Sequence, residues 1–135
     1  MSDTKIAIVV RDDLAVWQKL NVTAFLTSGL VGVNKQLLGE TYEDANGNHY
    51  NPLAIQPIIV LKANAAGIQK IYHRAMDRGA RLSIYIEEMF ATGNDVDNRA
   101  VVKEHRPEEM NVVGLGLYDD RKTVDKITKG ASLQS

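Results

Sequence analysis

The sequence contains no cysteine, few aromatic residues and no marked excess of either charge. The absence of cysteine excludes disulfides, thiolate zinc sites and a cysteine nucleophile. A net charge of −1 gives no overall sign of a polyanion partner, so we expect no DNA partner. No segment approaches the roughly 20 apolar residues of a membrane-spanning helix, and the N-terminus lacks the apolar core of a signal peptide. We therefore expect a cytoplasmic protein without a membrane partner.

The composition is typical of a globular chain. Of the 135 residues, 44% are hydrophobic and 24% are charged, which provides enough apolar material for one buried core. The sequence shows no linker, internal repeat or low-complexity segment. We therefore expect a single domain over residues 1–135.

Apolar runs rich in β-branched residues alternate with segments of helical periodicity. The runs predict strands buried on both faces, and the periodic segments, with their caps, predict helices. The expected strands are 6–10, 58–61, 82–86 and 111–118, and the expected helices are 14–31, 64–79, 95–105 and 120–130. This order favours a three-layer α/β/α domain with a mixed, mostly parallel four-stranded core sheet. Residues 36–50 predict a β-hairpin at an edge of the sheet, with Asn46-Gly47 in a type I′ turn.

The first helix is apolar around most of its circumference. Trp17, Leu20, Ala24 and Val31 lie on one side, and further apolar residues lie on the others: Val22, Phe25, Leu26 and Leu30. A helix of this kind is buried on two sides. One side can pack on the sheet, and the other could pack on a second element or on a second subunit. Of these we expect a homodimer through this helix. Val22 and Leu26 are candidate positions in that interface.

Four segments carry a resemblance to a known family. They are Lys5–Leu14 (KIAIVVRDDL) with Lys19–Ala24 (KLNVTA), Pro57–Ala63 (PIIVLKA) with the helix ending at Arg78-Gly79, Val112–Tyr118 (VVGLGLY) and Val124–Gly130 (VDKITKG). By their order and spacing the chain resembles the uncharacterised bacterial family called domain of unknown function 2000. That family is similar in fold to type II peptidyl-tRNA hydrolase, which cleaves the ester linking a peptide to tRNA. The resemblance implies a four-stranded mixed core sheet between helical layers, in a homodimer.

The resemblance also suggests site residues. Lys19 matches a lysine early in the first helix of the hydrolase, and Arg11 with Asp13 matches its strand-end Arg-x-Asp. The hydrolase histidine falls near Leu26, and its aspartate falls near Glu87 or Glu88. The hydrolase Gly-x-Thr-Gln turn is replaced by 89–93, and 94–110 is an insertion. These departures separate the chain from the best-known chemistry of that fold.

The polar residues at expected strand ends are the candidates for a site. Lys19, at a strand-to-helix mouth, could bind a phosphate or carboxylate or stabilise an oxyanion. Glu87 reaches the same sheet edge if its strand runs parallel to the first, and it could act as a base or orient water. The catalytic candidates are thus Lys19 and Glu87, and the ligand-binding candidates are Arg11, Asp13, Lys19, Thr92, Asn94 and Arg99. Each candidate also has a purely structural interpretation. Lys19 could be a solvated surface lysine, and Glu87 could be an ordinary polar residue at a strand end. The segment 92–99 could serve only as a helix cap, and Arg99 could form a surface ion pair.

No metal or cofactor is expected. Asp95 and Asp97 have the alternating spacing of a calcium loop, but the required glycine and final glutamate are missing. The three histidines, His49, His73 and His105, lack the spacing of a zinc site. No phosphate-binding or dinucleotide-binding fingerprint occurs.

Three functional hypotheses follow. The first is a protein that binds a small or anionic ligand at the mouth of the sheet, with 92–99 closing over it. The second is a peptidyl-tRNA hydrolase or related esterase. A tRNA partner is possible through the basic face of Lys122, Lys126 and Lys129, although net charge does not indicate it. The third is a dimeric interaction module without catalysis.

Overall fold

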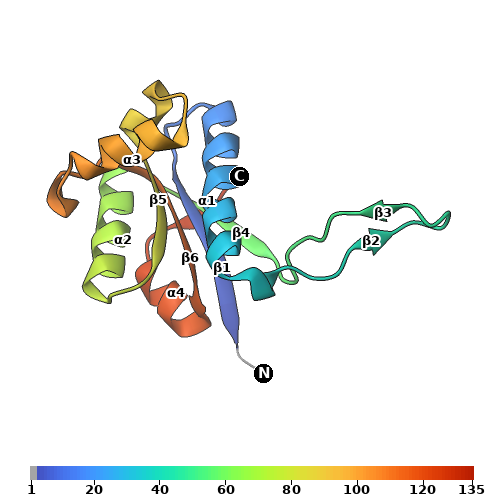
Figure 1. Ribbon diagram of the computed structural model, residues 1–135. Coiled ribbons are helices and arrows are strands. Elements are labelled where there is room, and N and C mark those ends of the chain that lie inside the picture. Colours follow the sequence, from blue (N-terminus) through green and yellow to red (C-terminus); the bar gives the residue numbers. More distant parts are fainter. Residues whose placement is uncertain (1–2) are drawn as a thin grey trace.

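The computed structural model describes residues 3–135, and its centre is a five-stranded sheet with helices on both faces (Figure 1). The expected helices and core strands all form, with boundaries shifted by a few residues. In chain order the elements are β1 (Thr4–Arg11), α1 (Val16–Val33), η1 (Lys35–Leu37), β2 (Tyr42–Glu43), β3 (His49–Tyr50), β4 (Ile58–Ala63), α2 (Ala65–Asp77), β5 (Leu82–Ile86), η2 (Glu87–Ala91), α3 (Asp95–Lys103), η3 (Pro107–Glu109), β6 (Val112–Asp120), α4 (Arg121–Ile127) and β7 (Ser132–Leu133).

The prediction of a mostly parallel sheet is wrong. The strand order is β5-β6-β1-β4-β7, and only β1 and β4 pair in parallel, whereas β6 is antiparallel to both of its neighbours and β7 is antiparallel to β4. If β6 paired in parallel with β5, the chain between them would have to run from one end of the sheet back to the other. The segment between β5 and β6, which contains η2 and α3, instead begins and ends at the same end of the sheet. Alternation of helices and strands in the sequence does not distinguish these two arrangements.

Two strand directions nevertheless agree with the sequence analysis. Because β1 and β5 are both antiparallel to β6, they run in the same direction. The carboxyl ends of β1 and β5 therefore lie at one edge of the sheet, where Arg11 and Glu87 meet.

The sheet is also one strand wider than the predicted four. β7 pairs with β4 through only two residues, Ser132 and Leu133, and the backbone N–H of Gln134 donates to the Val60 carbonyl oxygen at 3.0 Å. A strand this short has no readable alternation of apolar and polar residues. It covers the outer edge of β4.

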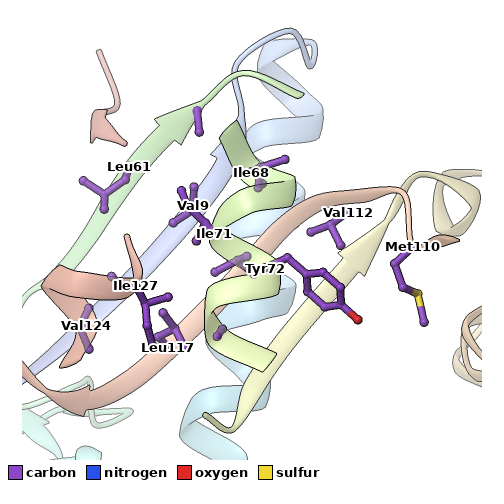
Figure 2. Close-up of a cluster of buried hydrophobic side chains, with 14 of the residues drawn as sticks. Val9, Leu61, Ile68, Ile71, Tyr72, Met110, Val112, Leu117, Val124 and Ile127 are labelled. Carbon is purple, nitrogen blue, oxygen red and sulfur yellow. The ribbon is translucent and has the colours of Figure 1, made fainter. Parts of the chain in front are cut away.

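Alternate residues of β1 enter two hydrophobic clusters, one on each face of the sheet. Ile6, Ile8 and Val10 join the cluster beneath α1, and Ala7 and Val9 join the cluster beneath α2 and α4. Figure 2 shows the second cluster, with α2 lying across the strands. Its labelled helix residues are Ile68, Ile71, Tyr72, Val124 and Ile127. The continuous apolar run of β1 is therefore explained by helices on both faces.

Helix α1 lies very close to β6. A Cβ atom placed on Gly114 would lie 2.5 Å from Cγ1 of Val22. One placed on Gly116 would lie 3.1 Å from Cδ1 of Leu30. Glycine at these strand positions therefore permits the helix to pack against the sheet. In the part of the chain that the structure describes, no helix has the length and apolar character for a membrane crossing.

The hairpin is not an edge of the main sheet, as predicted, but a separate two-stranded sheet that projects from the body (Figure 1). We call residues 38–55 the arm. Its turn also differs from the prediction, because Gly47 has a φ of 85° whereas Asn46 does not have positive φ. A type I′ turn needs positive φ at both central residues. A longer loop forms instead, in which Asp44 accepts hydrogen bonds from the backbone N–H groups of Asn46 and Asn48.

Candidate functional site

A groove runs beside the edge strand β5, between α1 on one side and η2 with α3 on the other. It consists of two adjoining cavities of about 540 and 330 Å³. Both cavities are lined by Phe25, Tyr85, Met89, Asp95 and Asn98. These shared residues make the two cavities one continuous surface feature.

Four aromatic rings line the smaller cavity and form a continuous row, each ring beside the next. The ring centroids are 6.2 Å apart for Trp17 and Phe90, 5.2 Å for Phe90 and Tyr85, and 5.8 Å for Tyr85 and Phe25. The sequence has one tryptophan and two phenylalanines, and all three lie here. Trp17 and Phe25 remain 62% and 51% exposed, so apolar ring surface is available to a ligand. Tyr85 is buried, and this burial raises the pKa of its phenol.

The alternation of β5 explains why these rings meet. Tyr85 belongs to the cluster beneath α1, whereas Leu82 and Ile84 pack into the cluster on the opposite face. Helix α1 comes close enough to meet Tyr85 because Gly29 has no side chain: a Cβ atom there would lie 2.6 Å from Oγ of Ser83. Helix η2 then carries Phe90 back over Tyr85 immediately after the strand.

The polar rim of the groove comes from the segment 92–99. The Thr92 hydroxyl donates to the Met89 carbonyl oxygen at 2.9 Å and also contacts the Asn98 side chain. Asn94 caps α3, because its Oδ1 accepts from the backbone N–H of Asp97 at 2.8 Å. Arg99 pairs with Asp95 one turn earlier on the same helix. Thr92, Asn94 and Arg99 were all predicted as ligand-binding residues, and all three line the groove.

A second polar cluster lies at the carboxyl ends of β1 and β5. The Arg11 guanidinium donates to Asp13 at 2.6 Å, to Glu87 at 3.0 Å and to the Asn111 side chain at 3.5 Å. Asn111 in turn donates to the other Glu87 oxygen at 2.7 Å. Partial desolvation opposes the charge of Arg11, but the hydrogen bonds and negative charges of Asp13 and Glu87 outweigh it and raise its pKa. Arg11 is thus occupied by carboxylates of its own chain.

Lys19 does not join that cluster. Its side chain is half-buried on α1, and within residues 3–135 its ammonium group has no hydrogen bond or ion pair. It lines neither cavity of the groove. The structure therefore brings together Arg11, Asp13 and Glu87, places Thr92, Asn94 and Arg99 in the groove, and leaves Lys19 apart from both groups.

One interaction that the sequence did not reveal fixes the wall of the groove. The Nε2 atom of His105 lies 2.9 Å from Glu88, and its Nδ1 atom lies 2.7 Å from the Val101 carbonyl oxygen. Because both ring nitrogens face oxygen atoms, this histidine links the end of α3 to η2. No pattern in the sequence connects Glu88 to His105, because the rest of η2 and the whole of α3 lie between them. Among residues 3–135, no cluster of three potential metal ligands occurs.

The aromatic lining was also missed from the sequence. Trp17 and Phe25 were assigned to a helix that is apolar on most sides, and Phe90 was treated only as part of a replaced turn. The small number of tryptophan and phenylalanine residues in the chain is the signal that could have indicated this site. When the few large aromatic residues of a chain are not all in the core, their exposed surfaces mark a site for contact.

The comparisons with known proteins agree in family and fold. A solved structure of Atu0240 from Agrobacterium tumefaciens strain C58, described as a protein of unknown function, is 56% identical to this chain. The match covers 100% of both chains with a TM-score of 0.97. A search of curated proteins found no match. The family described as "Protein of unknown function (DUF2000)" matches residues 4–135. The chain belongs to the DUF2000 family.

Proposed function

We propose that the groove binds a small, flat molecule that carries neutral hydrogen-bonding groups. The observation that carries this proposal is the row of four aromatic rings, because flat ring systems gain most from stacked or edge-on contact with such side chains. Each cavity also has a volume within the range of roughly 300–1,000 Å³ that is usual for small-molecule sites.

The polar residues of the groove define the chemistry of the ligand further. The aromatic end is lined by four uncharged polar residues, Asn21, Thr92, Asn94 and Asn98, and by Asp95, whose carboxylate is paired with Arg99. Amide and hydroxyl groups match the ring nitrogens and carbonyl groups of a heteroaromatic compound. At the other end, Lys103 lines the larger cavity and has no ion pair within residues 3–135. Lys103 supplies a cation that could bind an acidic substituent of the ligand. The proposed ligand can therefore be anionic, as the sequence analysis expected.

The site differs in position from the one expected at Lys19. Arg11 is already paired with both Asp13 and Glu87, so an anion bound there would have to displace two carboxylates. The groove lies next to the same edge of the sheet but is lined by α1, β5, η2 and α3. It is therefore the better-formed binding site.

Trp17 provides a direct assay because it is the only tryptophan and lines the groove. A panel of heteroaromatic acids and amides should include compounds that change its fluorescence in a saturable way. Phe90→Ala should weaken their binding about tenfold, consistent with the loss of an aromatic contact. Met76→Ala, an exposed position on α2, is the matched control and should have no effect. Failure of every compound to bind, or equal binding by Phe90→Ala, would contradict the proposal.

The peptidyl-tRNA hydrolase hypothesis is a second proposal. Its support is that the carboxyl ends of β1 and β5 share one edge, where Glu87 lies beside Arg11. Release of peptide from labelled peptidyl-tRNA is the direct assay. If Glu87 orients water, Glu87→Gln should lower the rate by about 100-fold or more, and Lys19→Ala should lower it if Lys19 stabilises charge. No turnover, or turnover unchanged by both variants, would exclude this activity.

A further inference from the structure

We propose that the arm packs on the exposed apolar face of α1 in a second copy of the chain, so that two copies clasp each other reciprocally. This inference goes beyond ligand binding in the groove and does not depend on it. It rests on the shape of the arm, on the apolar surface of both elements and on their charges.

The arm is an element that the rest of its own chain does not cover. Its two strands pair only with each other, through Tyr42 with Tyr50 and Glu43 with His49. An isolated two-stranded hairpin is marginally stable in water. Yet the arm places large apolar side chains in solvent, with Leu53 60% and Ile55 63% exposed. Such a surface is typical of an element that is completed by contact with another molecule.

The tip of the arm is held in shape by Asp44. Its carboxylate accepts hydrogen bonds from the Tyr50 hydroxyl at 2.7 Å and the Asn48 side chain at 2.9 Å, in addition to two backbone N–H groups. The bond from Tyr50, followed by those from Asn48, lowers the pKa of Asp44 to about 2. The arm is thereby ordered before it meets a partner, which reduces the entropy lost on binding.

Helix α1 offers the matching surface. Its side opposite the sheet carries Val16 and Leu20, which are 72% and 67% exposed. Farther along the same side are Ala24 and Gly32, which leave room for close approach. An apolar helix face of this length is more than the core of a single copy can use.

The charges of the two elements favour this pairing. The arm contains Glu40, Glu43 and Asp44 but no lysine or arginine. Two arms laid against each other would bring like charges together, which is unfavourable. Helix α1 contains no acidic residue, and Lys19 is its only charged residue. The acidic arm therefore meets no like charge on α1.

The available area is sufficient for a stable dimer. Large apolar side chains outside the groove are exposed by 40% or more on both elements: Leu38, Tyr42, Tyr50, Leu53 and Ile55 on the arm, and Val16 and Leu20 on α1. A buried aromatic side chain covers about 150–250 Å², so each half-exposed residue offers about 100 Å². In a two-fold dimer each copy contributes both elements. This gives on the order of 700 Å² per copy, or about 1,400 Å² in total, which lies within the range of standard interfaces.

Sedimentation velocity of the full chain at tens of micromolar tests the proposal. The unmodified protein should sediment as a dimer, and Leu20→Glu or Leu53→Glu alone should raise the dissociation constant at least tenfold. Both residues are exposed, so circular dichroism should show the fold unchanged. Met76→Glu, on the opposite helical layer, is the control and should leave the dimer intact. Ring-compound binding by Leu53→Glu should also persist, because Leu53 lies outside the groove.

Mixing the two variants gives the sharpest result. The arm of the Leu20→Glu copy and the α1 face of the Leu53→Glu copy are both intact, so the mixture should form mixed dimers with one native contact. Neither variant should dimerise as well alone. A monomeric unmodified protein would overturn the proposal. So would disruption by only one of the two substitutions, since that would indicate contact between two helices or between two arms.

Discussion

Helices α1 and α2 pack on opposite faces of the same sheet but use their apolar residues differently. Helix α2 buries one stripe, Ile68, Ile71, Tyr72 and Ala75, and the rest of its surface is mainly polar. Helix α1 buries Val22, Leu26 and Leu30 on the sheet and still exposes further apolar residues to solvent. The comparison shows that apolar residues which a helix does not bury in its own core indicate contacts with other molecules. In α1 they line the groove and form the exposed face on which we propose that the arm of a second copy packs.

The starts of the two helices differ as well. Helix α2 begins at a side-chain cap, in which Oδ1 of Asn64 accepts from the backbone N–H of Gly67 at 2.7 Å. Helix α1 follows Ala15, which has no polar side chain, and the Gln18 side chain accepts from the Ala15 N–H instead. Local signals therefore define α2, whereas packing on the sheet defines α1.

The largest expected effect is the loss of stability when a charge is placed on the buried side of α1 and not on its exposed side. Val22→Asp should unfold the protein or cost about 4 kcal/mol or more, because it places an unpaired charge in a fully buried position. Leu20→Asp, on the exposed side, should change stability by less than about 0.5 kcal/mol. Urea denaturation at a concentration that favours monomers measures both. Equal losses would show that α1 does not have a buried and a free side.

Val22 and Leu26 were candidate interface positions in the sequence analysis, and the structure corrects this. Both lie in the core beneath α1, at 0% and 2% exposure. Substituting them would test folding and not association.

On α2, the buried stripe should respond strongly and the outer face weakly. Ile71→Ala should lower the free energy of unfolding by about 2–5 kcal/mol, because it leaves a cavity beneath the helix. Met76→Ala, at a position that is 44% exposed, should cost less than about 1 kcal/mol. Chemical denaturation checks the pair, and a similar cost at both positions would remove the distinction between a one-stripe and an all-round helix.

The close approach of α1 to β6 can be tested by overpacking. Gly114→Ala should cost about 1–3 kcal/mol because the new methyl group would overlap Val22. Gly116→Ala, where the nearest atoms lie at 3.1 Å, should cost less. Combining Gly114→Ala with Val22→Ala should cost less than the sum of the two single changes, since the smaller side chain makes room. Strict additivity in thermal denaturation would argue against direct contact.

The smallest effects concern the helix starts. Asn64→Ala should destabilise the protein by about 1 kcal/mol through loss of the α2 cap. Ala15→Ser should stabilise it by about 0.5 kcal/mol if serine supplies the cap that α1 lacks. The midpoint of thermal unfolding should move in opposite directions for the two variants. A loss of stability with Ala15→Ser would mean that the backbone at this position does not accept a capping side chain.

Much of the secondary structure was predictable because it depends on local patterns. The expected helices 64–79 and 120–130 begin at Asn64 and Asp120, and both side chains accept a hydrogen bond from the backbone N–H of the third helical residue. The antiparallel direction of β6 was not predictable, since it depends on where α3 lies and not on the pattern within any strand. The predicted type I′ turn failed because Asp44 satisfies the backbone of a longer loop.

The candidate site was predictable only in part. Arg11 and Glu87 were expected at one edge of the sheet if their strands run in the same direction, and they form an ion pair there. The groove was not foreseen as an aromatic site, because Trp17 and Phe90 are far apart in the sequence and meet only through the packing of α1 on β5. Contacts of this kind arise from tertiary structure, and no periodicity in a single segment records them.

The short strand β7 bears on how this sheet resists aggregation. An uncovered β4 edge would offer a row of unpaired backbone groups to any extended chain in solution. Two residues of β7 and the N–H of Gln134 pair with part of the β4 edge. Because β7 is so short, it exposes few unpaired backbone groups of its own. A chain shortened before Ser132 would keep its core but expose a template for intermolecular strand pairing, so its solubility would fall before its fold did.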